Sequence, residues 1–353
     1  MDIFINGISA ISPQNTIDNS SFLKEIKEYN KNQLNCIEPN YKEYLKPILA
    51  RRMSRILKMS NVAAQISLKD ACLIKPDAIN TATGLGCMAD TEKFLSSIIN
   101  NDEKLLTPTS FIQSTHNTIG GQIALMLKVH GHNFTYVNGN SSFESALLDS
   151  IMLINDNEAN NVLLGAADEI TDLTHTIKDK LNIFKKEPVN NLKLLKYNSS
   201  GSIEGEGAAF FVLGNKKNSN YYAILKNISF LNSSGNRKEI EKHITTFVDS
   251  NFNSFDNLDL VISGYNGDNE YDKIYYELAK SIFANKKQSY YKHLCGEYMT
   301  SSSFAMWLAA QIAKTGNIPD EICLNSSNLK KPKNILIHNH HKNKLHTFIL
   351  LSR

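Results

Sequence analysis

Short apolar runs typical of buried strands alternate with amphipathic segments along this chain, and that alternation limits the fold more than any other feature. The first run covers residues 3–11, and residues 51–73 carry apolar side chains at three- and four-residue spacing, as an amphipathic helix does. A similar series returns later, from an expected strand at 258–262 to two closing strands around Ile335 and Phe348. We therefore predict an α/β protein with an internal duplication.

The two expected halves meet near the middle of the chain. The runs 210–213 and 222–225 are aliphatic and aromatic, and we expect them to pair with each other as neighbouring strands. On this basis the N-terminal half comprises residues 1–214, and the C-terminal half, which has the shorter connections, comprises residues 215–353.

Composition excludes several classes of partner. Charged residues make up 21% of the chain and the net charge is only +3, so no dominant basic surface is expected for nucleic acid or an anionic membrane. No segment resembles a secretory leader, and no run of about 18 apolar residues exists, so we expect a cytoplasmic protein without membrane insertion. The five cysteines form no C-x-x-C pair, which argues against a disulfide framework and against zinc. We expect no metal and no other cofactor.

A strand, a tight turn and a helix surround Asn140. Residues 134–137 are β-branched and aromatic, Asn138 and Gly139 favour a turn, and the segment 145–154 has a helical pattern. This arrangement usually presents a nucleophile at the N-terminus of a helix, where N–H groups lower its pKa. Such chemistry requires cysteine, but the chain has asparagine.

Four segments carry a resemblance to the β-ketoacyl synthase family. Residues 131–142, GHNFTYVNGNSS, resemble the family's elbow, in which a G-P-N turn leads through a strand to T-A-C-A. Counting from the shared glycine places Asn140 at the cysteine. Residues 51–71 are similar to the family's R-x-M helix, 161–169 to its strand ending in G-G-x-E/D, and 202–209 to its G-E-G-A strand. All four occur in the family's order.

The resemblance implies a fold and an assembly. The fold is the thiolase-like five-layer αβαβα sandwich built from two related halves. A dimer is implied because in this fold each subunit's middle loops complete the acyl pocket of its neighbour. The candidates for the tunnel or interface, whose bulk would set product length, are Cys87, Met88, Phe111, Ile112 and His116.

The departures from the family pattern concern catalysis. Condensation needs a thiolate to hold the acyl chain and two histidines to drive malonyl decarboxylation and stabilise the enolate. The segment 292–297 resembles the K-x-x-x-G-H motif and keeps Lys292, but Glu297 stands at the histidine. A carboxylate there repels a developing enolate unless it is protonated. In the family, the second histidine lies in the stretch before the last strands. The corresponding segment here, 325–333, contains no histidine.

The family's glycine-rich terminal loop is also replaced, by the histidine-rich segment 338–346, in which His346 marks the degenerate site position. The segment lacks the spacing with Cys or carboxylates that zinc sites show, so we favour packing over metal binding for its histidines. For the remaining reactive side chains we favour packing or interface roles over catalysis; these are Cys87, Cys295, His116, Glu204 and Glu206.

These departures lead to a functional hypothesis. The amide at residue 140 resembles the Gln that loading-type synthases carry at the cysteine position. Those enzymes decarboxylate malonyl groups, but the reaction still uses the two histidines. We expect a non-condensing subunit resembling the chain-length factors of type II polyketide and aryl-polyene systems. Its partners would be a cysteine-bearing ketosynthase subunit and acyl carrier protein. Two alternatives stay open: a divergent synthase or acyltransferase with another nucleophile, and a homodimer that binds acyl chains or carrier protein.

Overall fold

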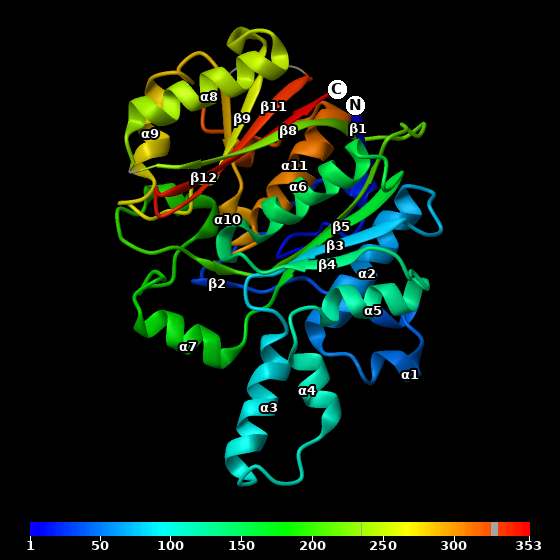
Figure 1. The fold of residues 1–353 in the computed structure, drawn as a ribbon. Helices are drawn as coiled ribbons and strands as arrows, with labels where there is room; N and C mark the ends of the chain where they lie inside the picture. Colours follow the sequence, from blue (N-terminus) through cyan, green and yellow to red (C-terminus); the bar gives the residue numbers. More distant parts are fainter. Residues whose placement is uncertain (234, 326–330) are drawn as a thin grey trace.

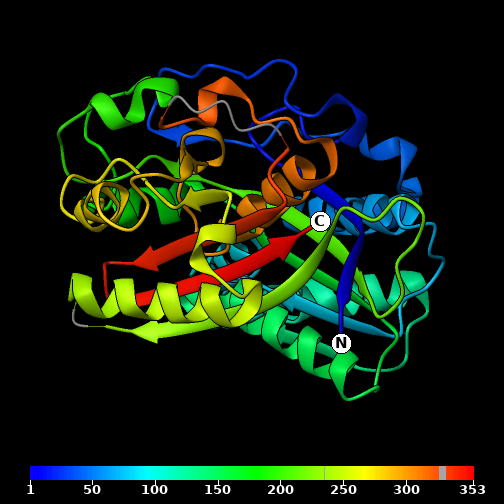
Figure 2. The same ribbon diagram turned by 90° about the horizontal axis from the view of Figure 1, so that it is seen from above.

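Ten strands of the described chain form one hydrogen-bonded series that divides into two halves with the same strand order (Figures 1 and 2). The computed structural model describes residues 1–233, 235–325 and 331–353. The N-terminal order is β1-β7-β5-β3-β4, formed by β1 (Ile3–Ile11), β3 (Ala78–Ala82), β4 (Asn133–Tyr136), β5 (Asn161–Asp168) and β7 (Gly207–Gly214). The C-terminal order is β8-β12-β11-β9-β10, formed by β8 (Ala223–Asn232), β9 (Leu260–Ser263), β10 (Lys287–Tyr290), β11 (Asn334–His341) and β12 (Leu345–Ser352). Counted along the chain, both orders read 1-5-4-2-3, which confirms the duplication.

The two halves are joined through β1. This strand pairs antiparallel with β7 along most of its length, and with β8 only through Ile3, Phe4 and Ile5. The expected pairing of residues 210–213 with 222–225 is therefore wrong, because β1 lies between the two strands. We propose the boundary between the halves in the connection from β7 to β8, where one strand order ends and the other begins.

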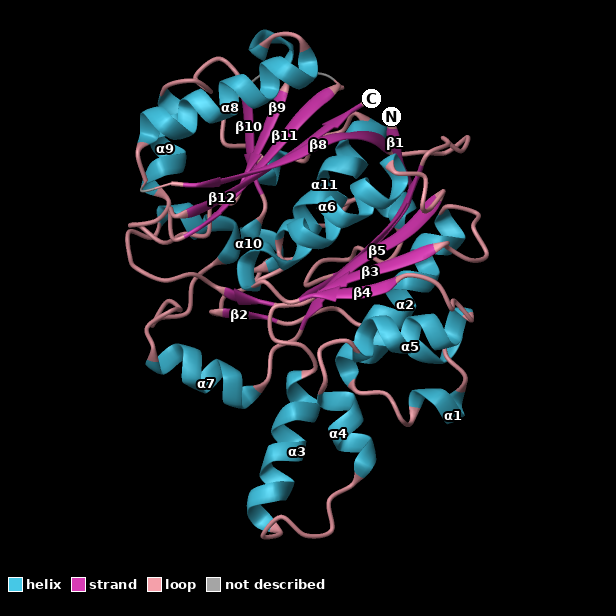
Figure 3. Cartoon of the chain, viewed as in Figure 1, coloured by secondary structure: helices cyan, strands magenta, loops and turns pink. Residues whose placement is uncertain are grey.

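Helices separate and cover the two halves of the sheet (Figure 3). The middle layer is formed by α6 (Ser142–Asn155) and α11 (Ser302–Thr315), which contact strands of both halves. The outer layers are formed by α2 (Arg55–Asp70) and α5 (Thr118–Leu127) on the N-terminal half, and by α8 (Arg237–Phe252) and α9 (Lys273–Lys280) on the C-terminal half. The layers follow the thiolase-like αβαβα order.

Burial explains the composition of these elements. Helix α11 is buried from Ser302 to Ala313, and its small and apolar residues suit a helix enclosed on all sides. Strand β5 is apolar on both faces between its end residues, Asn161 and Asp168, because helices cover both faces of its sheet. Helix α2, by contrast, buries one face and presents residues such as Lys58 and Lys69 on the other.

Several elements lie outside these layers. Helices α3 (Met88–Asn100) and α4 (Pro108–Ser114) form an arm that projects from the body of the molecule (Figure 1). Shorter elements are α1 (Pro47–Ala50), α7 (Asp172–Lys180), α10 (Lys292–Cys295) and the parallel pair β2 (Gln33–Leu34) and β6 (Glu204–Gly205). Within the described ranges, no helix is long and apolar enough to cross a membrane.

Candidate functional site

The elbow around Asn140 has the predicted strand–turn–helix form. Strand β4 ends at Tyr136, a 3₁₀ turn covers Gly139–Ser141, and α6 begins at Ser142. Gly139 has φ +58°, a left-handed conformation that glycine adopts without strain. The Ser142 hydroxyl fixes the turn by accepting from Asn138 N at 2.8 Å and donating to Gly139 O at 2.7 Å. This rigid turn holds Asn140 in the wall of a cavity.

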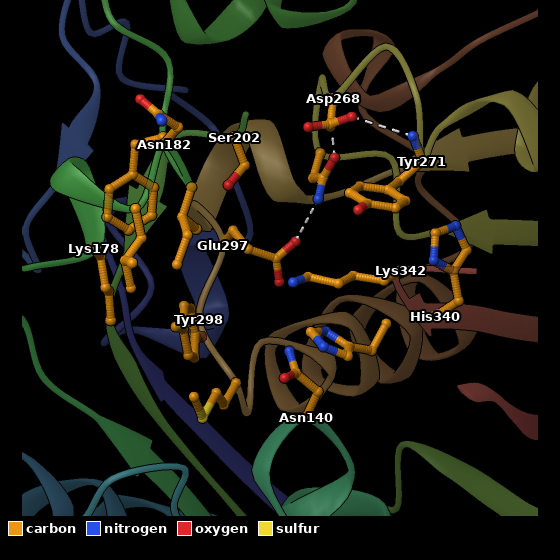
Figure 4. Close-up of a pocket in the computed structure, with 16 residues that line it drawn as sticks. Asn140, Lys178, Asn182, Ser202, Asp268, Tyr271, Glu297, Tyr298, His340 and Lys342 are labelled. Atoms are coloured by element: carbon orange, nitrogen blue, oxygen red, sulfur yellow. Dashed lines mark hydrogen bonds between the residues drawn. The ribbon is translucent and has the colours of Figure 1, made fainter. Parts of the chain in front are cut away.

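That cavity is about 340 Å³ in volume and opens between the two halves of the molecule. Figure 4 shows Asn140, Glu297, His340 and Lys342 around the same space. The Asn140 amide has no hydrogen-bond partner in the part of the chain that the structure describes, so it is available to a ligand. A carboxamide can donate and accept hydrogen bonds, but it cannot form a thioester as a thiolate does.

Glu297 lines the cavity and is held there by an ion pair. Its Oε2 atom lies 2.7 Å from Lys292 Nζ and accepts a hydrogen bond of 2.9 Å from Asn266 Nδ2 (Figure 4). Lys292 is buried at the start of α10, so its ammonium is shielded from solvent and needs this carboxylate. The position that resembles the family's histidine thus carries negative charge, which opposes the formation of an enolate.

Asn266 was not identified from the sequence. It follows β9, and its loop is fixed because Asp272 accepts hydrogen bonds from Asn266 N at 3.1 Å and Gly267 N at 2.8 Å. A search of the residues after each buried strand would have found it, since such ends meet at one edge of a sheet. In the segment 325–333, residues 326–330 lie outside the described residues. Asn325 lies beside β10, where it accepts from Gln288 N.

The histidine-rich segment forms a tight β-hairpin. Lys342 and Asn343 have φ of +49° and +53°, and Lys344 N donates to His341 O at 3.0 Å, which closes a two-residue turn. His340, His341 and Lys342 line the cavity from this hairpin.

His346, which we expected at the site, does not line the cavity. It pairs with His340 across the hairpin and is buried, with its Nδ1 atom 3.1 Å from His338 Nε2. Burial lowers the pKa of His346 to about 4 and that of His338 further below its usual range. These side chains stack with Phe348 on β12, on the face of the sheet that α8 and α9 cover. In the described residues, no group of three or more His, Cys, Asp or Glu side chains is arranged to hold a metal ion.

The cysteines with a conceivable catalytic role are buried. Cys87 and Cys295 are both fully buried, and neither lines the cavity. Burial raises the pKa of both thiols, with a further contribution from Glu169 and Asp90 at Cys87. A nucleophilic thiol needs the opposite environment, an electropositive site open to substrate. Packing therefore accounts for both residues.

The predicted tunnel and interface residues lie at the base of the arm. Cys87 precedes α3 and Met88 is half-buried, while Phe111 and Ile112 on α4 are 56% and 59% exposed. His116 is exposed between α4 and α5, with its ring against Gly86. None of the five lines the cavity, so their tunnel or interface role stays a prediction.

The buried carboxylates of Glu204 and Glu206 bind side chains and backbone groups from other segments of the chain. Glu206 accepts two hydrogen bonds of 2.6 Å from the Arg55 guanidinium, and two more from Cys36 N and Ile170 N. Glu204 binds His175 Nδ1 at 2.5 Å and Lys178 Nζ at 3.1 Å, which attaches α7 to the body. Their acidic oxygens are thus engaged within the chain.

Comparisons with known proteins agree with this architecture. Residues 27–185 match the family model for the β-ketoacyl synthase N-terminal domain. Among curated proteins, none matches the sequence significantly. One similar structure is the ishigamide ketosynthase/chain length factor, at 14% identity and a TM-score of 0.79, over 99% of this chain and 98% of that one.

Two further solved structures extend the comparison. The complex of a type II PKS acyl-carrier protein with its ketosynthase bound to the hexaketide (AntDE:AntF) has 13% identity and a TM-score of 0.79, over 99% of each chain. A β-ketoacyl synthase from Burkholderia phymatum STM815 has 13% identity and a TM-score of 0.78, over 100% of this chain and 99% of that one. At these identities the likeness establishes the fold. Residues 27–185 are thus similar to the N-terminal domain of β-ketoacyl synthases, and the chain has the thiolase-like fold.

Proposed function

We propose that this chain is a non-condensing partner of a cysteine-bearing ketosynthase. In that role it would resemble a chain-length factor, and would shape the acyl tunnel at the heterodimer interface while the partner elongates a polyketide or polyene chain bound to acyl carrier protein. The observation that carries this proposal is the cavity itself: an elbow of the family's form presents Asn140, and the carboxylate of Glu297 lines the same cavity in an ion pair with Lys292.

The chemistry of the cavity favours the role of a non-condensing partner over that of an enzyme with a different nucleophile. A divergent synthase would need another nucleophile, but Cys87 and Cys295 are buried outside the cavity and their thiols have raised pKa values. Malonyl decarboxylation would place a carboxylate and then an enolate near Glu297, and like charges there raise the barrier.

The edge of the N-terminal sheet supports a dimer. Strand β4 ends the strand order and pairs only with β3 in the described chain, so one edge of its backbone is open. Apolar side chains lie exposed on β4, directly after it and on the helices that cover it, namely Phe134, Val137, Leu125, Leu148 and Met152. An open strand edge with apolar side chains is a typical surface for association with another chain. The arm also exposes apolar side chains, Phe111 and Ile112.

The assemblies among the similar structures fit the proposal. One comprises a ketosynthase and a chain length factor, and another includes an acyl-carrier protein with its ketosynthase. We infer that the partner of this chain supplies the thiolate, and that acyl carrier protein delivers the growing chain to the pair.

Co-purification with a cysteine-bearing ketosynthase encoded in the same gene cluster tests the proposal. Native mass spectrometry should show a one-to-one complex of this chain with the ketosynthase. Phe134→Glu should weaken that complex by at least about tenfold, because it places a charge in the centre of an apolar contact. Ile177→Glu on α7 is the matched control, since Ile177 is similarly exposed, at 51% against 57%, but lies away from β4.

The alternatives give different results in the same experiment. A homodimer that is disrupted by Phe134→Glu, with no binding of the ketosynthase, would favour an acyl- or carrier-binding homodimer. Equal effects of the two substitutions would contradict the assignment of the β4 surface.

A further inference from the structure

The turn of the β11–β12 hairpin forms one wall of the cavity. His341 and Lys342 line the cavity from this turn, and Figure 4 shows the Lys342 side chain directed into it. At the other end of the turn, Ser233 N, which follows β8, donates to Lys344 O at 2.8 Å. The shape of the cavity on this side therefore depends on how the turn is held.

An imidazole ring holds the turn. Asn343 N donates a hydrogen bond of 3.2 Å to His340 Nδ1, so this nitrogen acts as an acceptor. A neutral imidazole has one donor and one acceptor, whereas both nitrogens of a charged imidazole are donors. His340 must therefore be neutral, with its proton on Nε2, for the turn to keep this bond.

The rings behind the turn have the same requirement. His338 Nε2 and His346 Nδ1 lie 3.1 Å apart, and one of these nitrogens must accept from the other. Both side chains are fully buried, and His340 stacks on the buried Tyr275 with ring centroids 4.5 Å apart. A proton on the accepting nitrogen would place two donors in contact without water to solvate them. This end of the hairpin is thus compatible only with neutral histidines.

The surroundings of the three rings do not compensate a positive charge. Burial lowers the pKa of His340 well below its usual range, and His346 and Lys292 lower it further. Carboxylates near the hairpin are Glu239, on α8, and Glu297, which is already paired with Lys292. In the described chain, the charged and titratable groups that face the rings and the turn are His243 and Glu239 on α8, Tyr271 and Tyr275 at α9, Lys292 on α10, Glu297 after it, and His341, Lys342 and Lys344 on the turn.

The hairpin is anchored just behind these rings. Thr347 is the first residue of β12 after His346, and its hydroxyl donates to the buried Glu144 Oε1 on α6 at 3.0 Å. From Thr347 onward β12 is buried and pairs with β8. Only the strand pairs His340–His346 and His341–Leu345 lie between this anchor and the turn. Loss of those two pairs would move the turn without unfolding the sheet.

We propose that the β11–β12 turn is an acid-sensitive gate: a proton taken up at His340 Nδ1 breaks the bond from Asn343 and releases His341 and Lys342 from the cavity wall. The gate does not depend on the proposed partner, because it controls access to the cavity of this chain from solvent.

Linkage gives the direction and size of the effect. In the open state His340 is hydrated, so its pKa returns to about 6.5. The closed state is therefore fully favoured above that pH, and it loses stability as the pH falls toward the low value of the buried ring. A single histidine of this kind raises the ratio of open to closed molecules about 25-fold between pH 7 and pH 5.

Hydrogen exchange of the full chain tests the gate. Mass spectrometry at pH 7, 6 and 5, with rates corrected for the intrinsic effect of pH, should show that segment 340–346 loses protection by roughly 25-fold at pH 5. Strand β7 should keep its protection, because the sheet stays folded. Unchanged protection of segment 340–346 would overturn the gate, and so would an equal loss in β7, which would show global unfolding.

Two variants of His340 identify the ring that takes up the proton. His340→Asn keeps an acceptor near the position of Nδ1 that is not protonated in this range, so the turn should stay protected from pH 7 to pH 5. His340→Gln moves its amide away from that position, so protection should be low at every pH. His130→Asn is the matched control, since His130 is exposed before β4, and it should follow the wild type. A loss in His340→Asn equal to that of the wild type would overturn the proposal.

Labelling of the cavity tests the consequence for access. Asn140→Cys places a thiol in the cavity wall, and peptide mass spectrometry follows its alkylation by fluorescein maleimide, a bulky reagent. At each pH, the rate is divided by that of the same variant combined with His340→Asn, which cancels the change in thiolate fraction. This ratio should rise roughly 25-fold from pH 7 to pH 5. A constant ratio would contradict the gate even if the turn lost protection.

Discussion

At the scale of single residues, the site combines a neutral amide with a buried ion pair. Asn140 presents hydrogen-bonding groups to the cavity, and Glu297 directs one carboxylate oxygen at both Lys292 and Asn266. Removing one member of a buried pair is costly because the other charge is left without a counterion. Glu297 therefore contributes to stability through this pair, and its charge opposes the formation of an enolate in the cavity.

Replacement of Lys292 should show how far the stability of the chain depends on the Lys292–Glu297 ion pair. Lys292→Met keeps the length of the side chain but leaves the Glu297 carboxylate without its ammonium, so we expect a loss of about 3 kcal/mol in the free energy of unfolding. The double variant with Glu297→Gln should lose much less, because no unpaired charge remains. Urea denaturation of the single and double variants measures the difference. A single variant as stable as the wild type would show that the pair contributes little.

At the scale of elements, the β11–β12 hairpin closes with a two-residue turn. Its stability depends on buried, neutral imidazoles: His338 contacts His346 and Phe348, and His340 stacks on Tyr275. Burial lowers the pKa values of all three histidines, and His346 lowers those of His338 and His340 further. His243 on α8 adds to the positive charge that would form there.

The hairpin should make the protein sensitive to acid. A histidine whose pKa is lower in the folded state than in the unfolded state is protonated more readily on unfolding. Its contribution to stability is full above about pH 6.5 and is lost as the pH falls toward the folded value, which is about 4 for His346. The melting temperature should therefore decrease from pH 6.5 to 4.5, and less so in His346→Gln, which cannot be protonated in this range. Identical pH profiles for the two proteins would rule out His346 as a cause.

At the scale of the whole molecule, the sequence allowed prediction of the scaffold better than of the cavity. The strand–helix alternation, the duplication and the elbow at Asn140 depend on local patterns, and the structure confirms all three. The pairing of the strands at 210–213 and 222–225 could not be inferred locally, because β1 comes from the other end of the chain to lie between them.

The residues that line the cavity could not be inferred from local sequence patterns either. Asn266, Met299 and Lys342 belong to separate connections of the C-terminal half, and they meet Asn140 only because the duplicated topology brings the ends of both sheets together. Glu297 was found because it stands within a motif. His346 was expected beside it, but the two-residue turn directs His340 and His341 to the cavity instead. Topology, more than residue type, determines which side chains share the site.

With asparagine at residue 140, this cavity should not hold an acyl group covalently. Intact-protein mass spectrometry of the isolated chain after incubation with acyl-loaded carrier protein tests this prediction, with Asn140→Cys as the positive control. The variant restores a thiol at the N-terminus of α6, where it should accept an acyl group, although Glu297 should still prevent condensation. The wild type should show no added mass, whereas a stoichiometric acyl adduct on the wild-type chain would contradict the account.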